Sequence, residues 1–226
     1  MKQAEHCQDC GAPANERAQR CPYCGSAFAP DPQAADPERS LSELSALPTP
    51  SVEQCLVIAE LYLVAGKNTH SIQVLERLLA RAPDHPRAHL LLCMALLGFN
   101  QEVVQSGIHR DRIVAHLRWL RAHAPELREA RWIEHYLAME DQWQAGEVAA
   151  AQRDGEAAVA EFPGNYLLHF MLGLAFCHFG AIAEASIDEV RRAHAHISLA
   201  AEINPRFTPA VANARALADY LTRLLS

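Results

Sequence analysis

Four apolar helical runs in the larger, C-terminal part of the chain each end at a proline. These prolines are Pro83, Pro125, Pro163 and Pro205, and successive ones lie 42, 38 and 42 residues apart. No strand-like alternation of apolar and polar residues of any length separates them. Self-similarity at a period of this size indicates stacked pairs of helices, because one pair cannot bury its own apolar stripe. Residues 51–226 are therefore predicted to form an all-α solenoid of helix pairs.

The first helix pair carries the most detailed pattern. Ser51 and Gln54 form a capping box that starts it, and Pro83 ends it. The run resembles the tetratricopeptide (TPR) repeat, whose small, aromatic, turn and second-helix small positions are occupied by Ala59, Tyr62, Gly66 and Ser71. Cys55 stands where the family has a tryptophan. In the fourth pair the matching glycine, aromatic and turn glycine are Gly173, Phe176 and Gly180, and the second helix is expected to run long, to Pro205.

The resemblance implies a TPR-like solenoid whose inner groove holds a peptide or helix of a partner protein. The run 209–225 is then expected to be a capping helix. The groove of this family is lined chiefly by the first helix of each pair, which predicts a partner-binding surface made of Leu56, Glu60, Leu63, Leu90, Met94, Phe170, Leu174 and His178. Residues at helical spacing also commonly form the core, so packing within the domain is the alternative interpretation.

A second motif occupies the N-terminus, where two Cys-x-x-Cys-Gly sequences follow one another. Their cysteines are Cys7, Cys10, Cys21 and Cys24. Two such turns supply the four thiolates of a closed tetrahedral zinc site, which leaves no position open for substrate. About 30 residues cannot bury enough apolar surface to fold alone, so the metal is expected to stabilise the fold. Residues 1–29 resemble the minimal zinc ribbon of many bacterial proteins, and one structural Zn²⁺ is predicted.

Two other roles for these cysteines are disfavoured. Disulfides require an oxidising compartment, and the first ten residues, MKQAEHCQDC, contain no apolar export segment. Redox chemistry at a Cys-x-x-Cys normally accompanies a βαβ pattern, which is not visible here. A cytoplasmic, bacterial protein is the resulting expectation.

Residues 30–50 are predicted to be an acidic, proline-rich linker. Within it Ser40 and Glu43 form a capping box, and leucines recur at helical spacing, which predicts a short amphipathic helix over 41–47. This helix could dock on the following domain or on a partner, and the sequence leaves both open.

Composition excludes several classes of function. The net charge is −7, and no segment is basic enough to drive contact with phosphates, which disfavours nucleic-acid binding. The longest apolar runs, such as 90–99, are too short to span a bilayer. The histidines are expected to be surface or internally satisfied residues, and Cys55, Cys93 and Cys177 are expected to be buried. The sequence contains no catalytic motif and no small-molecule site that can be identified.

These observations predict a non-catalytic adaptor or scaffold that binds other proteins. The solenoid would hold one partner and the zinc ribbon a second, within a larger assembly. One alternative is a regulatory zinc-ribbon protein associated with nucleic acid or a polymerase. A less favoured one is a metal-dependent enzyme with a histidine site in the solenoid.

Overall fold

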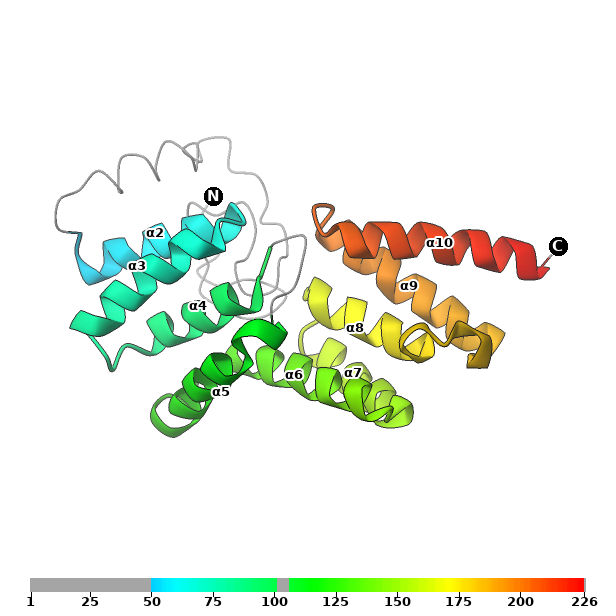
Figure 1. Cartoon of the computed structure of the whole chain (residues 1–226), viewed down its shortest axis with the longest axis horizontal. Coiled ribbons are helices and arrows are strands. Elements are labelled where there is room, and N and C mark those ends of the chain that lie inside the picture. The colour runs from blue at the N-terminus through cyan, green and yellow to red at the C-terminus, as the bar shows by residue number, and fades with distance from the viewer. Residues whose placement is uncertain (1–49, 101–105, 226) are drawn as a thin grey trace, which may run out of the picture. The chain divides into compact units, whose positions relative to one another are not determined.

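The computed structural model describes residues 50–100 and 106–225, and these ranges contain helices but no β-strand. Figure 1 shows the helices in chain order. They are α2 (Val52–Val64), α3 (Asn68–Arg81), α4 (Pro86–Leu97), α5 (Ser106–His123), α6 (Ala130–Ala145), α7 (Val148–Glu161), α8 (Tyr166–Phe176), α9 (Ile187–Ile203) and α10 (Thr208–Leu225). The predicted zinc ligands, the linker and the 41–47 helix all lie outside the described residues.

The described helices form two compact units. The first unit contains α2 to α5 and extends to Ala130, and the second contains α6 to α10 from Arg131 onward. Within the first unit α2 packs on α3, α3 on α4 and α4 on α5. In the second, α7 packs on α8, α8 on α9 and α9 on α10. Contacts between consecutive helices are typical of a helical repeat, so the prediction of an all-α helical solenoid is confirmed.

The two central helices, α4 and α8, are buried almost all round. Every α4 residue from Ala88 to Leu97 is buried, and in α8 only Leu174 is partly accessible. Their sequences explain this, because both are nearly continuous apolar runs without a polar stripe, as expected of a core helix. Each fully buried leucine or phenylalanine stabilises the fold by about 1.5–3 kcal/mol. The three single cysteines are buried as predicted, at Cys55, Cys93 and Cys177.

Local signals in the sequence correctly mark several helix ends. The side chain of Ser51 accepts the Gln54 N–H at 3.2 Å, and the Gln54 side chain accepts the Ser51 N–H at 2.8 Å, which confirms the predicted capping box. Gly66 has a φ of +69° in the turn between α2 and α3. A Cβ at Gly66 would meet the carbonyl oxygen of Asn100 at 2.9 Å, so this turn requires glycine for space as well as for conformation.

The fourth helix pair differs from the prediction of one long second helix. After α8 the chain forms two 3₁₀ turns, η1 (His178–Gly180) and η2 (Ile182–Glu184), before α9 begins. His178 and Phe179 have φ values of +50° and +51°, a conformation that ends a right-handed helix. Ser186 then caps α9 in a second capping box with Glu189. The additional residues therefore lengthen the connection and not the helix.

The two units share one four-helix arrangement at an offset of 80 residues. Helix α7 begins and ends 80 residues after α3. The same offset relates Pro83 to Pro163 and His89 to His169. It equals the sum of two successive proline spacings, 38 and 42. The true repeat is thus a double helix pair, whereas the sequence was interpreted as four single pairs.

Helix α10 stands where a third copy would begin, and its surface differs from that of α6. Met139 of α6 is fully buried and lies against Gly155 of α7. The residue 80 positions later is Asp219, which is exposed on α10. Tyr136 is likewise buried, while its counterpart Ala216 is exposed. This face of α10 therefore suits water and not a further packed helix, as in the terminal helices of repeat proteins.

The search for membrane-spanning segments in the described part of the chain finds no helix with the length and apolar character needed to cross a bilayer.

Candidate functional site

The structure places the residues predicted to bind a partner at very different depths. Leu63, Leu90 and Met94 are fully buried, and Leu56 and Phe170 are 8% and 9% exposed. Glu60 is 3% exposed and is bonded to Arg87. Leu174 and His178 are the two of this set that are partly accessible. A partner could reach the buried members only if the side chains around them moved, and their role in binding stays a prediction.

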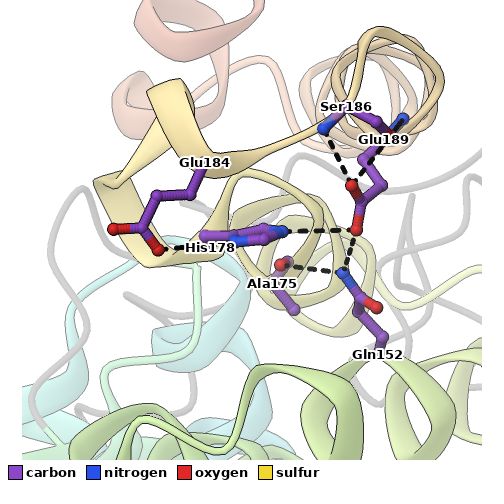
Figure 2. A network of polar contacts seen from close by, with 6 residues as sticks. All are labelled: Gln152, Ala175, His178, Glu184, Ser186 and Glu189. Atoms are coloured by element: carbon purple, nitrogen blue, oxygen red, sulfur yellow. Dashed lines mark hydrogen bonds and ion pairs between the residues drawn. The ribbon is translucent and has the colours of Figure 1, made fainter.

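His178 belongs to a polar network that ties α7, α8 and α9 together, shown in Figure 2. Its Nε2 lies 3.3 Å from Oε1 of Glu189, and its Nδ1 lies 3.9 Å from Oε2 of Glu184. From α7, Gln152 donates its amide to the same Glu189 oxygen at 3.0 Å and to the Ala175 carbonyl at 3.4 Å. The network holds the turn after α8 against the start of α9.

The carboxylate of Glu189 is the fixed charge of this network. The backbone N–H of Ser186, the Ser186 hydroxyl and the Gln152 amide all donate to it, and together they lower the pKa of Glu189 from its usual 4.5 to about 2. Glu189 is therefore ionised throughout the physiological range. Its place in the first turn of α9 also suits the positive end of the helix dipole.

The described residues contain no group of three or more His, Cys, Asp or Glu side chains arranged to hold a metal ion. Burial raises the pKa of the Cys177 thiol to about 11, and burial also raises that of Cys93. Both thiols are therefore protonated at neutral pH and poorly suited to nucleophilic attack.

Each unit contains one pair of histidines that the sequence analysis missed. In the first, Nδ1 of His89 lies 2.7 Å from Nδ1 of His116, and Nε2 of His89 lies 2.7 Å from the Pro83 carbonyl oxygen. In the second, the Nδ1 atoms of His169 and His196 are 3.0 Å apart, and Nε2 of His169 lies 2.8 Å from the Pro163 carbonyl oxygen.

The proline carbonyls define which ring nitrogens carry protons. A carbonyl oxygen only accepts, so Nε2 of His89 donates to Pro83. The Nδ1 of a neutral His89 is then an acceptor, and His116 must donate its Nδ1–H to it. Burial lowers the pKa of His89, and burial together with the neighbouring His89 lowers the pKa of His116 to about 4. The pair is neutral at pH 7.

The second pair follows the same logic. Burial lowers the pKa of His169, and burial with the neighbouring His169 lowers that of His196 to about 4. An ion pair accompanies each histidine pair, Arg112 with Glu76 in the first unit and Arg192 with Glu156 in the second. The repeated contacts therefore join the second helix of each copy to the third and fourth.

The histidine pairs predict a loss of stability in mild acid. The pKa of His116 and of His196 is about 4 in the folded chain and 6.5 ordinarily, so the unfolded chain binds protons first as the pH falls. Stability is complete above pH 6.5 and is lost between pH 6.5 and about 4. Because both rings are partly solvated, we expect about 1–2 kcal/mol from each. Urea unfolding at pH 7.5 and at pH 5 measures this loss.

The double variant His116→Gln, His196→Gln should reduce that pH dependence, while His109→Gln should leave it unchanged. Glu189 does not confound the comparison, because a pKa lowered from 4.5 to about 2 costs stability only below pH 4.5. Equal slopes between pH 7.5 and 5 for the wild-type chain and the double variant would contradict the assignment.

One signal in the sequence could have revealed the pairs. The members of each are 27 residues apart, and both recur at the 80-residue offset. A comparison of the chain with itself at that offset would have aligned them. Examining single helical faces could not, because each pair joins two different helices.

The comparisons with known proteins agree with the fold. No protein-family profile matches the chain, and no curated protein matches it. Among solved structures, a human IFIT1 dimer with PPP-AAAA is similar, with a TM-score of 0.55 and 17% sequence identity over 82% of this chain and 51% of that chain. The chain thus spans about half the length of that protein. The likeness supports a TPR-like helical solenoid.

Proposed function

We propose that this protein is a non-catalytic adaptor whose helical repeat binds another protein. The observation that carries the proposal is the fold itself, two copies of one helix-repeat unit of the kind that presents extended binding surfaces. The polar groups described above support it, because the histidine pairs, the arginine–glutamate pairs and the Glu189 network all join helices to one another. Their contacts are those of a scaffold.

Capture from a native lysate tests the adaptor function. The full chain should recover defined partner proteins, and a chain lacking residues 1–50 should keep those that the solenoid binds while losing those that the N-terminal segment binds. Recovery of no protein other than the chain itself at moderate salt would contradict the proposal.

The proposed zinc ribbon has a direct test. We infer that Cys7, Cys10, Cys21 and Cys24 hold about one structural Zn²⁺ per chain, on the basis of their paired spacing. The double variant Cys21→Ser, Cys24→Ser should lose the metal, since two of four thiolates are removed. Elemental analysis by mass spectrometry measures the content. Cys55→Ser, at a buried site in α2, is the matched control and should keep it.

Nucleic-acid binding is the second candidate, because the similar human structure contains PPP-AAAA. Charge disfavours it for the second unit, where residues 131–226 hold seven Lys and Arg against twelve Asp and Glu, a net of −5. Residues 51–130 are nearly balanced, with nine against eight. Binding of a labelled oligoadenylate that weakens steeply with salt would favour this candidate over the adaptor.

A further inference from the structure

An exposed aromatic pair lies in the second unit, next to the network of Figure 2. Trp143, near the end of α6, stacks on Phe179 in the turn after α8, with ring centroids 5.4 Å apart and ring planes 13° apart. Trp143 is 44% exposed and Phe179 is half-buried. Stacked rings that remain open to water offer a flat apolar face with a negative quadrupole.

The first unit shows that the scaffold does not require this exposure. The residues 80 positions earlier are Leu63 and Phe99, and both are fully buried. The second unit therefore carries a larger, aromatic side chain at the position of Leu63 and leaves it accessible. Large exposed aromatic groups on an otherwise shared framework mark interaction sites more often than packing needs.

The backbone beneath Phe179 supports a specific role. His178 and Phe179 both have positive φ values, which residues with bulky side chains rarely adopt. At the corresponding part of the first unit the positive φ values belong to Gly98 and Asn100, which tolerate them. Contacts from Glu189 and Glu184 to His178 hold the turn in this conformation. Strain of this kind persists where the surroundings enforce it.

The charges around the pair are negative. Glu184 and Glu189 flank His178, the residue before Phe179, and the Glu184 side chain is 74% exposed. On the other side, Gln142, the residue before Trp143, donates to Asp154. Glu189 is held ionised by its hydrogen bonds. With twelve acids against seven bases in residues 131–226, the field at this surface favours a cation.

We propose that Trp143 and Phe179, with the neighbouring carboxylates, bind an arginine- or lysine-containing segment of a partner protein. The proposal rests on the adaptor function and specifies its ligand chemistry. A guanidinium would stack on the indole while a second base pairs with Glu184. The fold already uses this contact internally, because the guanidinium carbon of Arg192 lies 4.0 Å from the centre of the Phe176 ring.

Fluorescence anisotropy with the full chain tests the site. The probe is a labelled ten-residue peptide of alternating arginine and serine, and its matched control replaces each arginine by glutamate. The wild-type chain should bind the basic peptide and not the acidic one. Trp143→Leu, which places the first unit's residue at this position, should raise the Kd about tenfold. Glu184→Gln should raise it and flatten its salt dependence.

Ile108→Ala is the control variant, since Ile108 is 79% exposed but lies in the first unit. It should bind the basic peptide as the wild-type chain does, and far-ultraviolet circular dichroism should show all variants folded. An unchanged Kd for Trp143→Leu, equal binding of the two peptides, no binding of either, or displacement of the basic peptide by oligoadenylate at lower concentration would each overturn the proposal. If Trp143→Leu still captures the partners of the wild-type chain, the adaptor function stands and this site is wrong.

Discussion

Replacing Phe207 by alanine is expected to lower the free energy of unfolding of the second unit by about 3–5 kcal/mol. The Phe207 ring lies between α9 and α10 and is 1% exposed. It meets Tyr166 edge-on at 5.2 Å between centroids and Phe170 at 5.0 Å. Truncation would remove both aromatic contacts and leave a cavity at the point where α10 begins. Urea unfolding followed by circular dichroism measures the loss.

Two further variants make this result specific. Leu224→Ala removes a side chain of α10 that is 45% exposed, and it should change stability by less than about 0.5 kcal/mol. Phe207→Leu should recover part of the loss, because Leu127 stands at the corresponding position of the first unit. A Phe207→Ala chain as stable as Leu224→Ala would show that this ring does not anchor α10.

The second large effect is expected at Gly173, inside α8. An added Cβ would lie 2.3 Å from Cγ1 of Ile197 and 3.1 Å from the carbonyl oxygen of Ala193, both on α9. Helices α8 and α9 would have to separate, and we expect Gly173→Ala to destabilise the chain by about 2 kcal/mol despite the higher helix propensity of alanine. Thermal unfolding monitored at 222 nm measures it.

Gly107→Ala is the matched control, because Gly107 also lies in a helix and has no atom within 4 Å of an added Cβ. There alanine should be neutral or stabilise by up to about 1 kcal/mol. The contrast between the copies explains the expected cost at Gly173. In the first unit the same position holds Cys93, whose sulfur lies 3.7 Å from the Ile113 carbonyl, so the first unit has room for a side chain there. Stabilisation by Gly173→Ala would show that the α8–α9 contact is looser than described.

The reach of sequence reasoning here follows the distance over which each feature is encoded. The capping box at Ser51, the glycine turn at Gly66 and the apolar runs of α4 and α8 involve residues within a few positions of one another, and each was predictable from local chemistry. The long second helix predicted up to Pro205 was wrong for a related reason. The break at His178 and Phe179 uses residue types that give no turn signal, and neighbouring side chains enforce it.

The partner surface illustrates the other limit. Helical spacing places Leu63, Met94 and Leu174 on faces of their helices, but only packing decides which of those faces is covered. Leu63 and Met94 are fully buried, whereas Leu174 is partly accessible. Trp143 was interpreted as part of a bulky helix, and its exposure could not be predicted, because the equivalent Leu63 is buried on the same framework.

What the sequence determined by itself is the all-α repeat, since periodicity, caps and prolines act within one helix pair. Tertiary structure alone decided that histidines 27 residues apart meet, that the arginine–glutamate pairs bridge 36 residues, and that an aromatic pair stays open in one copy only. These contacts depend on how helices distant in the chain are packed together, and no local pattern of residues encodes that.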